Sequence, residues 1–102
     1  MAERDLQASI VRYLNSQQDV VARVNGPGPA HVNGDPDIYF CAYGLMGQIE
    51  CKLPGETLTK AQHYRIGEWA EAFAWCTVAT CKQDAVDLLA AMGEYASVHA
   101  LI

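Results

Sequence analysis

The pattern of hydrophobic and polar residues near the start of the chain has the period of an α-helix. Apolar residues recur there at three- and four-residue steps, at Leu6, Ile10, Tyr13 and Leu14. This repeat predicts an amphipathic helix over residues 3–17. Glu3 lies three residues before Leu6 and therefore close to the buried face of that helix. Acids in a first turn ordinarily complement the helix dipole, but this position leaves a role for Glu3 at a site open.

Alternating apolar and polar positions predict strands in four later segments, which are residues 19–25, 37–42, 46–53 and 75–81. Between the first two, residues 25–29 contain two prolines and two glycines, which regular structure does not tolerate. A nucleotide-binding loop would continue with a G-K-[ST] motif and a helix. Neither follows here, so we interpret this segment as a flexible loop that is available for substrate contact.

Two further helices are indicated in the second half of the chain. Thr59 and Gln62 have the spacing of a capping box at a helix start. The apolar stripe of this helix is formed by Ile66, Trp69, Ala70 and Phe73. Gln62 falls on the same side as that stripe, so capping the helix and lining a site are both open to it. A last helix is predicted from residue 83 or 84 to Met92, and Gly93 is the expected helix-ending residue.

The composition is that of one small folded domain spanning residues 1–102. Of these residues 51% are hydrophobic, which suffices for one core and is too little for two. There is no apolar run of about 18 residues, and no basic flank precedes an apolar stretch at the start. We therefore expect neither a membrane span nor a secretory signal. The expected location is the cytoplasm, including that of a bacterial host if a phage carries the gene.

Charge and cysteine usage narrow the possible partners. Twelve acids and seven bases give a net charge of −5, which counts against a protein that binds nucleic acid by charge alone. The four cysteines, Cys41, Cys51, Cys76 and Cys81, include no C-x-x-C pair, and three of them lie in apolar, strand-like segments. Because zinc ligands usually come in close pairs, we expect buried reduced thiols and not a zinc cluster.

Candidate chemistry is concentrated in residues 34–52. Asp37 follows a proline at the start of one predicted strand, and Glu50 and Lys52 lie on the next. Because residues two apart on a strand point to the same face, Glu50 and Lys52 lie side by side. Two carboxylates with the backbone carbonyl of Cys51 make an oxygen-rich set that suits Mg²⁺ or Mn²⁺. Lys52 would then orient a bound water or stabilise charge that develops on a phosphate.

Two turns between these strands are compatible with the sequence. A two-residue turn at residues 43–44 puts Asp37 directly opposite Glu50. A loop over residues 44–47 instead separates them by about 13 Å along the strand. A metal ion shared by both carboxylates favours the first register, or a bulge that restores it.

The competing interpretation is an edge hairpin that carries two acids and a lysine only to stay soluble. Against it stands the apolar character of both strands, which contain Ile38, Phe40, Ile49 and Leu53. Acids on such strands need partners, so the metal site is the preferred interpretation.

Taken together, these motifs resemble the VRR-NUC family of the PD-(D/E)XK nuclease superfamily. The resemblance is carried, in this order and at these intervals, by Glu3 with Leu6-Gln7 and Ile10, Gly34-Asp35-Pro36-Asp37, Ile49-Glu50-Cys51-Lys52 and Leu58-Thr59-Lys60-Ala61-Gln62. It extends to about Leu89, and the size is similar to that of stand-alone members from phages and bacteria. Each motif is too short to be specific by itself, and it is the joint order and spacing of the four motifs that make the resemblance specific. One departure is Phe73-Ala74-Trp75, where relatives often have a glycine that ends the helix.

The resemblance implies a restriction-endonuclease-like α/β core, in which helices flank a mixed sheet in the order α-β-β-β-α-β-α. It makes Asp37 and Glu50 metal ligands and Lys52 the catalytic lysine. It also makes Glu3 an acid that contributes to a metal or its water, and Gln62 a residue that lines the site. The implied cofactor is Mg²⁺ or Mn²⁺. Relatives of the stand-alone type act as homodimers on branched DNA, including four-way (Holliday) junctions.

The leading hypothesis is therefore a metal-dependent, structure-selective DNA endonuclease. We expect its site to gather four acids, Glu3, Asp35, Asp37 and Glu50, whose charge Mg²⁺ would offset. The bases left to hold phosphates are Arg4, Arg12, Arg23, Lys60, Arg65 and Lys82. The alternative is a nuclease-like module that binds DNA or protein without cutting, which the overall acidity favours and the intact set of two acids and a lysine disfavours. A hydrolase of RNA or small phosphates lacks an aromatic stacking platform.

Overall fold

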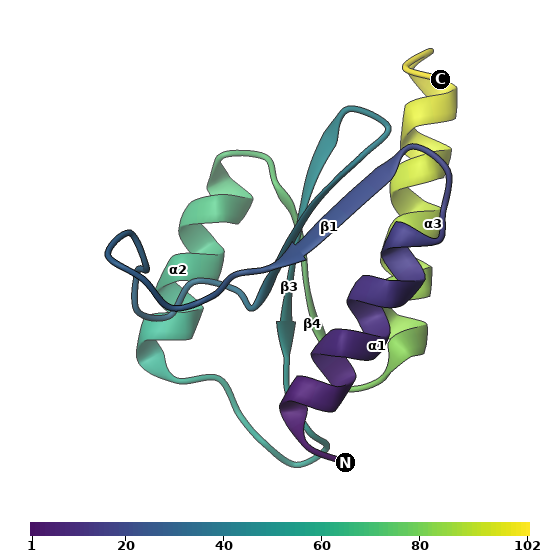
Figure 1. Cartoon of the computed structure of the whole chain (residues 1–102). Coiled ribbons are helices and arrows are strands. Elements are labelled where there is room, and N and C mark those ends of the chain that lie inside the picture. Colours follow the sequence, from purple (N-terminus) through teal and green to yellow (C-terminus); the bar gives the residue numbers. More distant parts are fainter.

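The structure, a computed structural model that describes residues 1–102, has three layers (Figure 1). Its elements are helix α1 (Glu3–Asn15), strands β1 (Val20–Val24), β2 (Ile38–Ala42) and β3 (Leu45–Cys51), helix α2 (Lys60–Glu71), strand β4 (Trp75–Ala79) and helix α3 (Lys82–Val98). The sheet is the middle layer, with α2 on one side and α1 and α3 together on the other. No helix is both long and apolar enough to cross a membrane.

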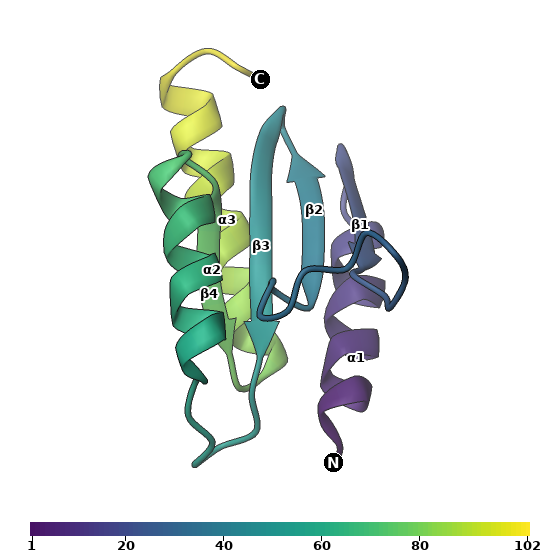
Figure 2. The ribbon, with the colours of Figure 1, turned by 90° about the vertical axis from the view of Figure 1, so that its left-hand side faces the viewer.

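The four strands form one mixed sheet in the order β1-β2-β3-β4. The pairs β1–β2 and β2–β3 are antiparallel, and β3–β4 is parallel. The predicted fold class and the predicted order α-β-β-β-α-β-α are therefore confirmed. Figure 2 shows that α2 covers the β4 side of its face of the sheet, while no helix lies over β1 and β2 on that face.

The turn between β2 and β3 sets the register on which the predicted site depends. Tyr43 and Gly44 have φ angles of 57° and 80°, the positive values that a two-residue type I′ hairpin turn requires. Ala42 faces Leu45 across this turn, and Ile38 faces Ile49 four residues further on. The two-residue turn is therefore confirmed, and the longer loop over residues 44–47 is wrong.

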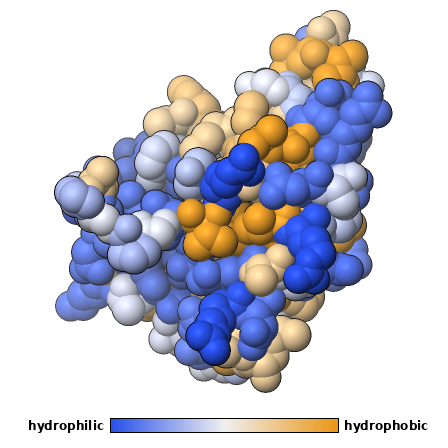
Figure 3. All heavy atoms as spheres, in the orientation of Figure 1, coloured by the Kyte–Doolittle hydropathy of each residue, from blue (hydrophilic) through white to orange (hydrophobic).

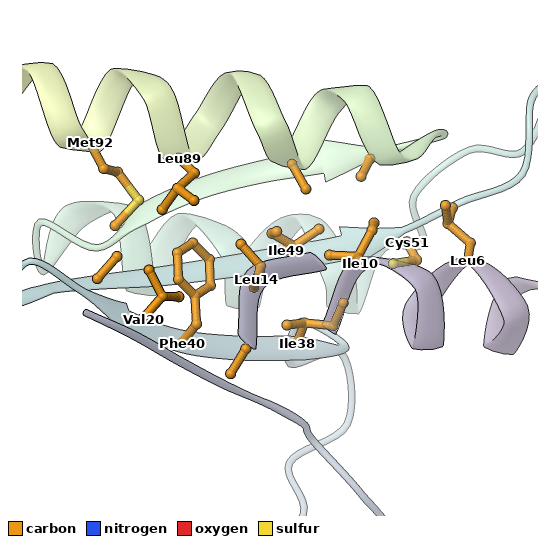
Figure 4. Packing of buried hydrophobic residues seen from close by; sticks show 14 residues of the cluster. Leu6, Ile10, Leu14, Val20, Ile38, Phe40, Ile49, Cys51, Leu89 and Met92 are labelled. Carbon is orange, nitrogen blue, oxygen red and sulfur yellow. The ribbon is translucent and has the colours of Figure 1, made fainter. Parts of the chain in front are cut away.

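The core lies between the sheet and the α1–α3 layer (Figure 4). It consists of fourteen buried residues, which are Leu6, Ile10, Leu14, Val20, Ala22, Ile38, Phe40, Ala42, Ile49, Cys51, Ala79, Ala85, Leu89 and Met92. The residues of α1 in this list recur at four-residue steps, so the predicted apolar stripe faces the sheet. On the outside, mainly hydrophilic residues cover the region of α1 in Figure 3, and hydrophobic residues gather at the C-terminal end of the chain.

The last helix is longer than the sequence predicted. It starts at Lys82 and continues through Gly93 to Val98, so the prediction that Gly93 ends it is wrong. A Cβ atom on Gly93 would lie 3.3 Å from the ring of Tyr43. The glycine therefore lets the helix approach the hairpin turn closely, and burial of Ala96 continues the packing beyond it. Tertiary contact outweighs the low helix propensity of glycine here.

The second helix is shorter than its apolar stripe suggested. It ends at Glu71, and Ala70 and Phe73 are exposed, so the prediction that they belong to a buried stripe is wrong. Phe73 has φ 70° and sits just past the helix, in the left-handed conformation that glycine normally provides at a helix end. Ile66 and Trp69 remain half-buried.

The cysteines are free thiols, but only Cys51 is fully buried. The prediction of buried thiols is wrong for Cys41 and Cys81, which are exposed. Cys41 lies on β2 on the face that no helix covers, and Cys81 is the N-cap of α3. An apolar sequence context did not reveal which face of the sheet would remain open.

Gly47 offers a test of the packing beneath the hairpin. A Cβ atom there would lie 2.1 Å from the ring of Phe40, which is 1% exposed and has no room to move. We expect Gly47→Ala to lower the free energy of unfolding by about 1–3 kcal/mol, measured by urea denaturation. The matched control is Gly67→Ala in α2, where no atom lies within 4 Å. It should raise stability by about 0.5–1 kcal/mol. Equal effects of the two variants would contradict this packing.

Candidate metal centre

Three carboxylates from distant parts of the chain meet at one end of the sheet. Glu3 opens α1, Asp37 immediately precedes β2, and Glu50 lies near the end of β3. Each offers one oxygen, and these oxygens all lie within 4.8 Å of one another. Such a group of three is compact enough to share one cation. The structure thus brings together the three acids that the sequence analysis assigned to a metal.

Asp37 is held in place by backbone contacts on both sides. Its Oδ2 accepts a hydrogen bond of 2.8 Å from the Cys51 amide of β3. Its own carbonyl accepts a hydrogen bond of 2.7 Å from the Asn25 amide, and the Asn25 side chain donates to the carbonyl of Pro36 at 3.3 Å. The two ends of the loop between β1 and β2 are therefore joined beside the carboxylate, which fixes its position.

Glu50 is the most deeply buried acid of the group. Its side chain is 1% exposed, and its Oε1 receives no hydrogen bond from any donor of the chain. Burial, together with a hydrogen bond to Asp37 and the negative charge of Asp37, raises the pKa of Glu50 from its ordinary value of 4.5 to about 9. Oε1 therefore has no partner within the chain and is available to a shared proton, a buried water or a cation.

Glu3 is joined by an acid that the sequence analysis did not single out. Glu56, in the loop after β3, forms a hydrogen bond with the Glu3 carboxyl group, and this contact raises the pKa of Glu3. Glu56 is itself fixed, because its Oε1 accepts the Leu53 amide at 2.6 Å. The contact of Glu56 with Leu53, together with its contact with Glu3, lowers the pKa of Glu56. No spacing motif marks a loop acid of this kind, so only the fold reveals it.

Lys52 is the one base within this acidic group. It is 8% exposed and lies just past the end of β3, two residues beyond Glu50. Its amide donates to the Ala79 carbonyl of β4 at 2.9 Å, so the pairing continues and the two side chains leave the same side of the sheet. The only ion pair within 4.0 Å in the chain joins Arg65 to Glu68, which leaves the Lys52 ammonium group without a carboxylate at contact distance. Its positive charge nevertheless lowers the pKa values of Glu3, Glu50 and Glu56 relative to what burial alone would give.

Cys51 lies between the two functional strand residues. Burial, followed by the charges of Asp37 and Glu50, raises the pKa of its thiol to about 12. The thiol is thus protonated at neutral pH and is a poor nucleophile and a poor metal ligand. The predicted contribution of Cys51, its backbone carbonyl, stays a prediction.

Gln62 has both of the roles that its position left open. It completes the capping box of α2. The backbone N–H of Gln62 donates to Thr59 Oγ1 at 3.1 Å, and the side-chain Oε1 of Gln62 accepts a hydrogen bond from the backbone N–H of Thr59 at 2.9 Å. Its Nε2 also donates to Glu50 Oε2 at 3.5 Å, at the upper limit of a hydrogen bond. The helix cap therefore fixes the side-chain amide of Gln62, whose Nε2 faces the buried carboxyl group of Glu50.

Asp35 does not belong to the acidic group, and this prediction is wrong. Its Oδ1 accepts a hydrogen bond of 3.2 Å from Trp69 Nε1 of α2. Next to it, Gly34 has φ 89°, and a Cβ atom there would lie 2.6 Å from the backbone of Ala61. The two residues anchor the long loop to α2, and the fourth acid near Glu3, Asp37 and Glu50 is Glu56 instead of Asp35.

Comparison with known proteins identified no relative of this chain. A scan against models of protein families, a search of curated proteins and a search of solved structures each found no match.

The burial of Glu50 predicts how stability depends on pH. Because its pKa is raised on folding, the folded chain holds more protons than the unfolded chain between about pH 5 and 9. The free energy of unfolding in the presence of a chelator should therefore fall as the pH rises through this window, by at most about 1.4 kcal/mol per pH unit. Glu50→Gln removes this titration and should flatten the profile measured by urea denaturation. Glu94→Gln, at an exposed site on α3, is the control, and parallel profiles for all three proteins would contradict the assignment.

Proposed function

We propose that this chain is a metal-dependent DNA endonuclease that hydrolyses phosphodiester bonds. The observation that carries the proposal is the buried carboxyl group of Glu50, whose Oε1 has no partner in the chain and which brings one oxygen to within 4.8 Å of carboxylate oxygens of Asp37 and Glu3. Folding a protein around an unsatisfied carboxylate costs free energy. A divalent cation bound by these oxygens offsets that cost, which is the role expected of a catalytic centre and not of a solubilising hairpin.

The residues present fit Mg²⁺ or Mn²⁺, because the available donors are carboxylate and carbonyl oxygens. Glu3, Asp37, Glu50 and the carbonyl of Cys51 would hold the ion. When bound, it supplies Lewis-acid polarisation of a phosphoryl oxygen and a lowered pKa for a bound water. It also offsets the negative charge that would otherwise repel a phosphodiester.

The chain's own groups then have distinct tasks. The Lys52 ammonium group donates hydrogen bonds to the attacking water or to the phosphate oxygen on which charge develops. The Cys51 amide and Gln62 keep Asp37 and Glu50 in place. Glu56 restrains Glu3 through the loop after β3. The contacts that hold Asp37, Glu50 and Glu3 are already made by the protein, so the acids of the site are preorganised.

The choice of DNA, and of branched DNA in particular, rests on the likeness of the four motifs to the VRR-NUC family. That likeness supports a structure-selective enzyme that acts on junctions in the cytoplasm.

The test is cleavage of linear, flapped and four-way DNA with Mg²⁺ or Mn²⁺, and again with chelator. We expect products only with metal, and a loss of about 10²-fold or more in rate for Asp37→Asn and Lys52→Met. Glu94→Gln should cleave at the wild-type rate. Folding of each variant is checked by circular dichroism. Tight binding without product on every substrate would favour the alternative, a module that binds without cutting.

We further propose that two copies associate through the surface beside β4. This strand is at the edge of the sheet. A hollow of about 460 Å³ next to it is lined entirely by hydrophobic residues, which are Ala70, Phe73, Ala74, Trp75, Cys76 and Tyr95. Phe73 is 90% exposed and keeps an unfavourable left-handed backbone. A second copy related by a two-fold axis covers this patch on both chains and pairs two sites for a branched substrate.

The substitution Phe73→Gly should affect folding and association in opposite directions. We expect it to raise monomer stability by about 1 kcal/mol, because it relieves the backbone and removes almost no packing. The same substitution should weaken the dimer at least ten-fold, measured by sedimentation across a concentration series. Val32→Gly, in the loop before β2, is a control for loss of an exposed apolar side chain elsewhere. The proposed dimer is contradicted if the wild-type protein sediments as a monomer at every concentration.

A further inference from the structure

Two of the seven bases converge on a polar hollow between α1 and α3, away from the acidic centre. Its volume is about 270 Å³, and it is lined by Ser9, Arg12, Tyr13, Ser16 and Lys82. No carboxylate is among these residues, although acids outnumber bases by twelve to seven in the chain. We propose that this hollow is a phosphate-binding site, whose occupant is a nucleic-acid backbone phosphate or a free phosphate.

The α1 side supplies one cation and two serine hydroxyl groups on a single face. Ser9, Arg12, Tyr13 and Ser16 stand at positions i, i+3, i+4 and i+7, which line up along a helix. Arg12 presents the planar donor fork that suits phosphate oxygens. The Ser16 hydroxyl is occupied, because it donates to the Tyr13 carbonyl at 2.6 Å. The Ser9 hydroxyl makes no hydrogen bond within the chain and is free to donate.

The α3 side supplies a second cation and the start of a long helix. Lys82 is the first residue of this 17-residue helix, and its Nζ lies 6.0 Å from the centre of the Tyr13 ring. Asp84 lies in the first turn of this helix and offsets its dipole, so the positive charge on this side comes from Lys82 itself. The nearest acid in the sequence, Asp84, is engaged by the Thr80 amide and hydroxyl at 2.9 and 3.4 Å.

The electrostatics of this arrangement point to an anion. Neither Arg12 nor Lys82 forms an ion pair, since the only pair within 4.0 Å joins Arg65 to Glu68. Both side chains are exposed, so their mutual repulsion is weak in water, but neither has a counter-charge in the chain. An anion with several acceptor oxygens removes that repulsion and accepts hydrogen bonds from both side chains and from Ser9. A phosphate group has this charge and this number of acceptors.

The hollow is separate from the carboxylate centre. Arg12 lies nine residues after Glu3 on α1, which is about 13 Å along the helix axis and half a turn around it. The two sites thus use opposite sides of the same helix. The inference therefore does not depend on the proposed nuclease activity, and a protein with an inactive acidic centre would still bind phosphate here.

The experiment uses the full chain labelled with ¹⁵N. Inorganic phosphate is titrated at constant ionic strength, with chloride as the balancing anion, and amide shifts are followed by NMR. We expect saturable shifts confined to the residues of the hollow and the start of α3. The double variant Arg12→Gln/Lys82→Gln should lose them, with affinity at least ten-fold lower. The control, Arg4→Gln/Arg23→Gln, removes the same charge from outside the hollow and should keep them.

A second arm distinguishes the two sources of phosphate. A short DNA duplex is titrated into wild-type protein and both double variants at several salt concentrations. If the duplex moves the same resonances, and the Arg12/Lys82 variant binds with a shallower salt dependence than the control, the occupant is a backbone phosphate. If only inorganic phosphate moves them, the occupant is a free phosphate. The inference is overturned if neither ligand gives localised shifts, or if both double variants respond alike.

Discussion

The burial of the Glu50 carboxylate at the end of the central strand is the constraint on which the rest of the structure depends. A side chain that is 1% exposed and lacks a donor for one oxygen is unfavourable by itself. It is tolerated because Asp37, Gln62 and Lys52 are arranged around it by the hairpin, the capping box of α2 and the strand repeat. Helix α1, packed on the sheet, brings Glu3 to the same place, so that oxygens of the three acids lie within 4.8 Å of one another.

The loops contribute as much as the regular elements to this arrangement. The segment between β1 and β2 is joined at its ends by Asn25 and anchored to α2 through Gly34 and Asp35. The loop after β3 returns Glu56 to the start of α1. Both loops thus transfer rigidity from packed helices to the carboxylates, which is what a site that must hold its geometry requires.

An acidic chain can act on a polyanion only if its charges are segregated. Here four acids surround Lys52 at one end of the sheet, whereas Arg12 and Lys82 face a hollow without acids on the far side of α1. Net charge therefore says little about this protein's partners, and the position of each charge says more. A divalent cation held at the proposed site would offset part of the negative charge of the first region, whereas the second region carries the sign that suits phosphate.

The sequence by itself determined the order of the elements and the apolar face of α1, because periodicity is a local property. It also indicated Glu3, Asp37 and Glu50 as members of one site, Glu3 only through the resemblance of its motifs to a known family. Only the tertiary structure decided that Tyr43-Gly44 forms the turn, that α3 passes through Gly93, that Phe73 is exposed, and that Glu56 and not Asp35 joins the other acids. The reason is physical: these outcomes depend on which backbones approach closely and which sheet face a helix covers, and such long-range contacts leave no periodic signal in the chain.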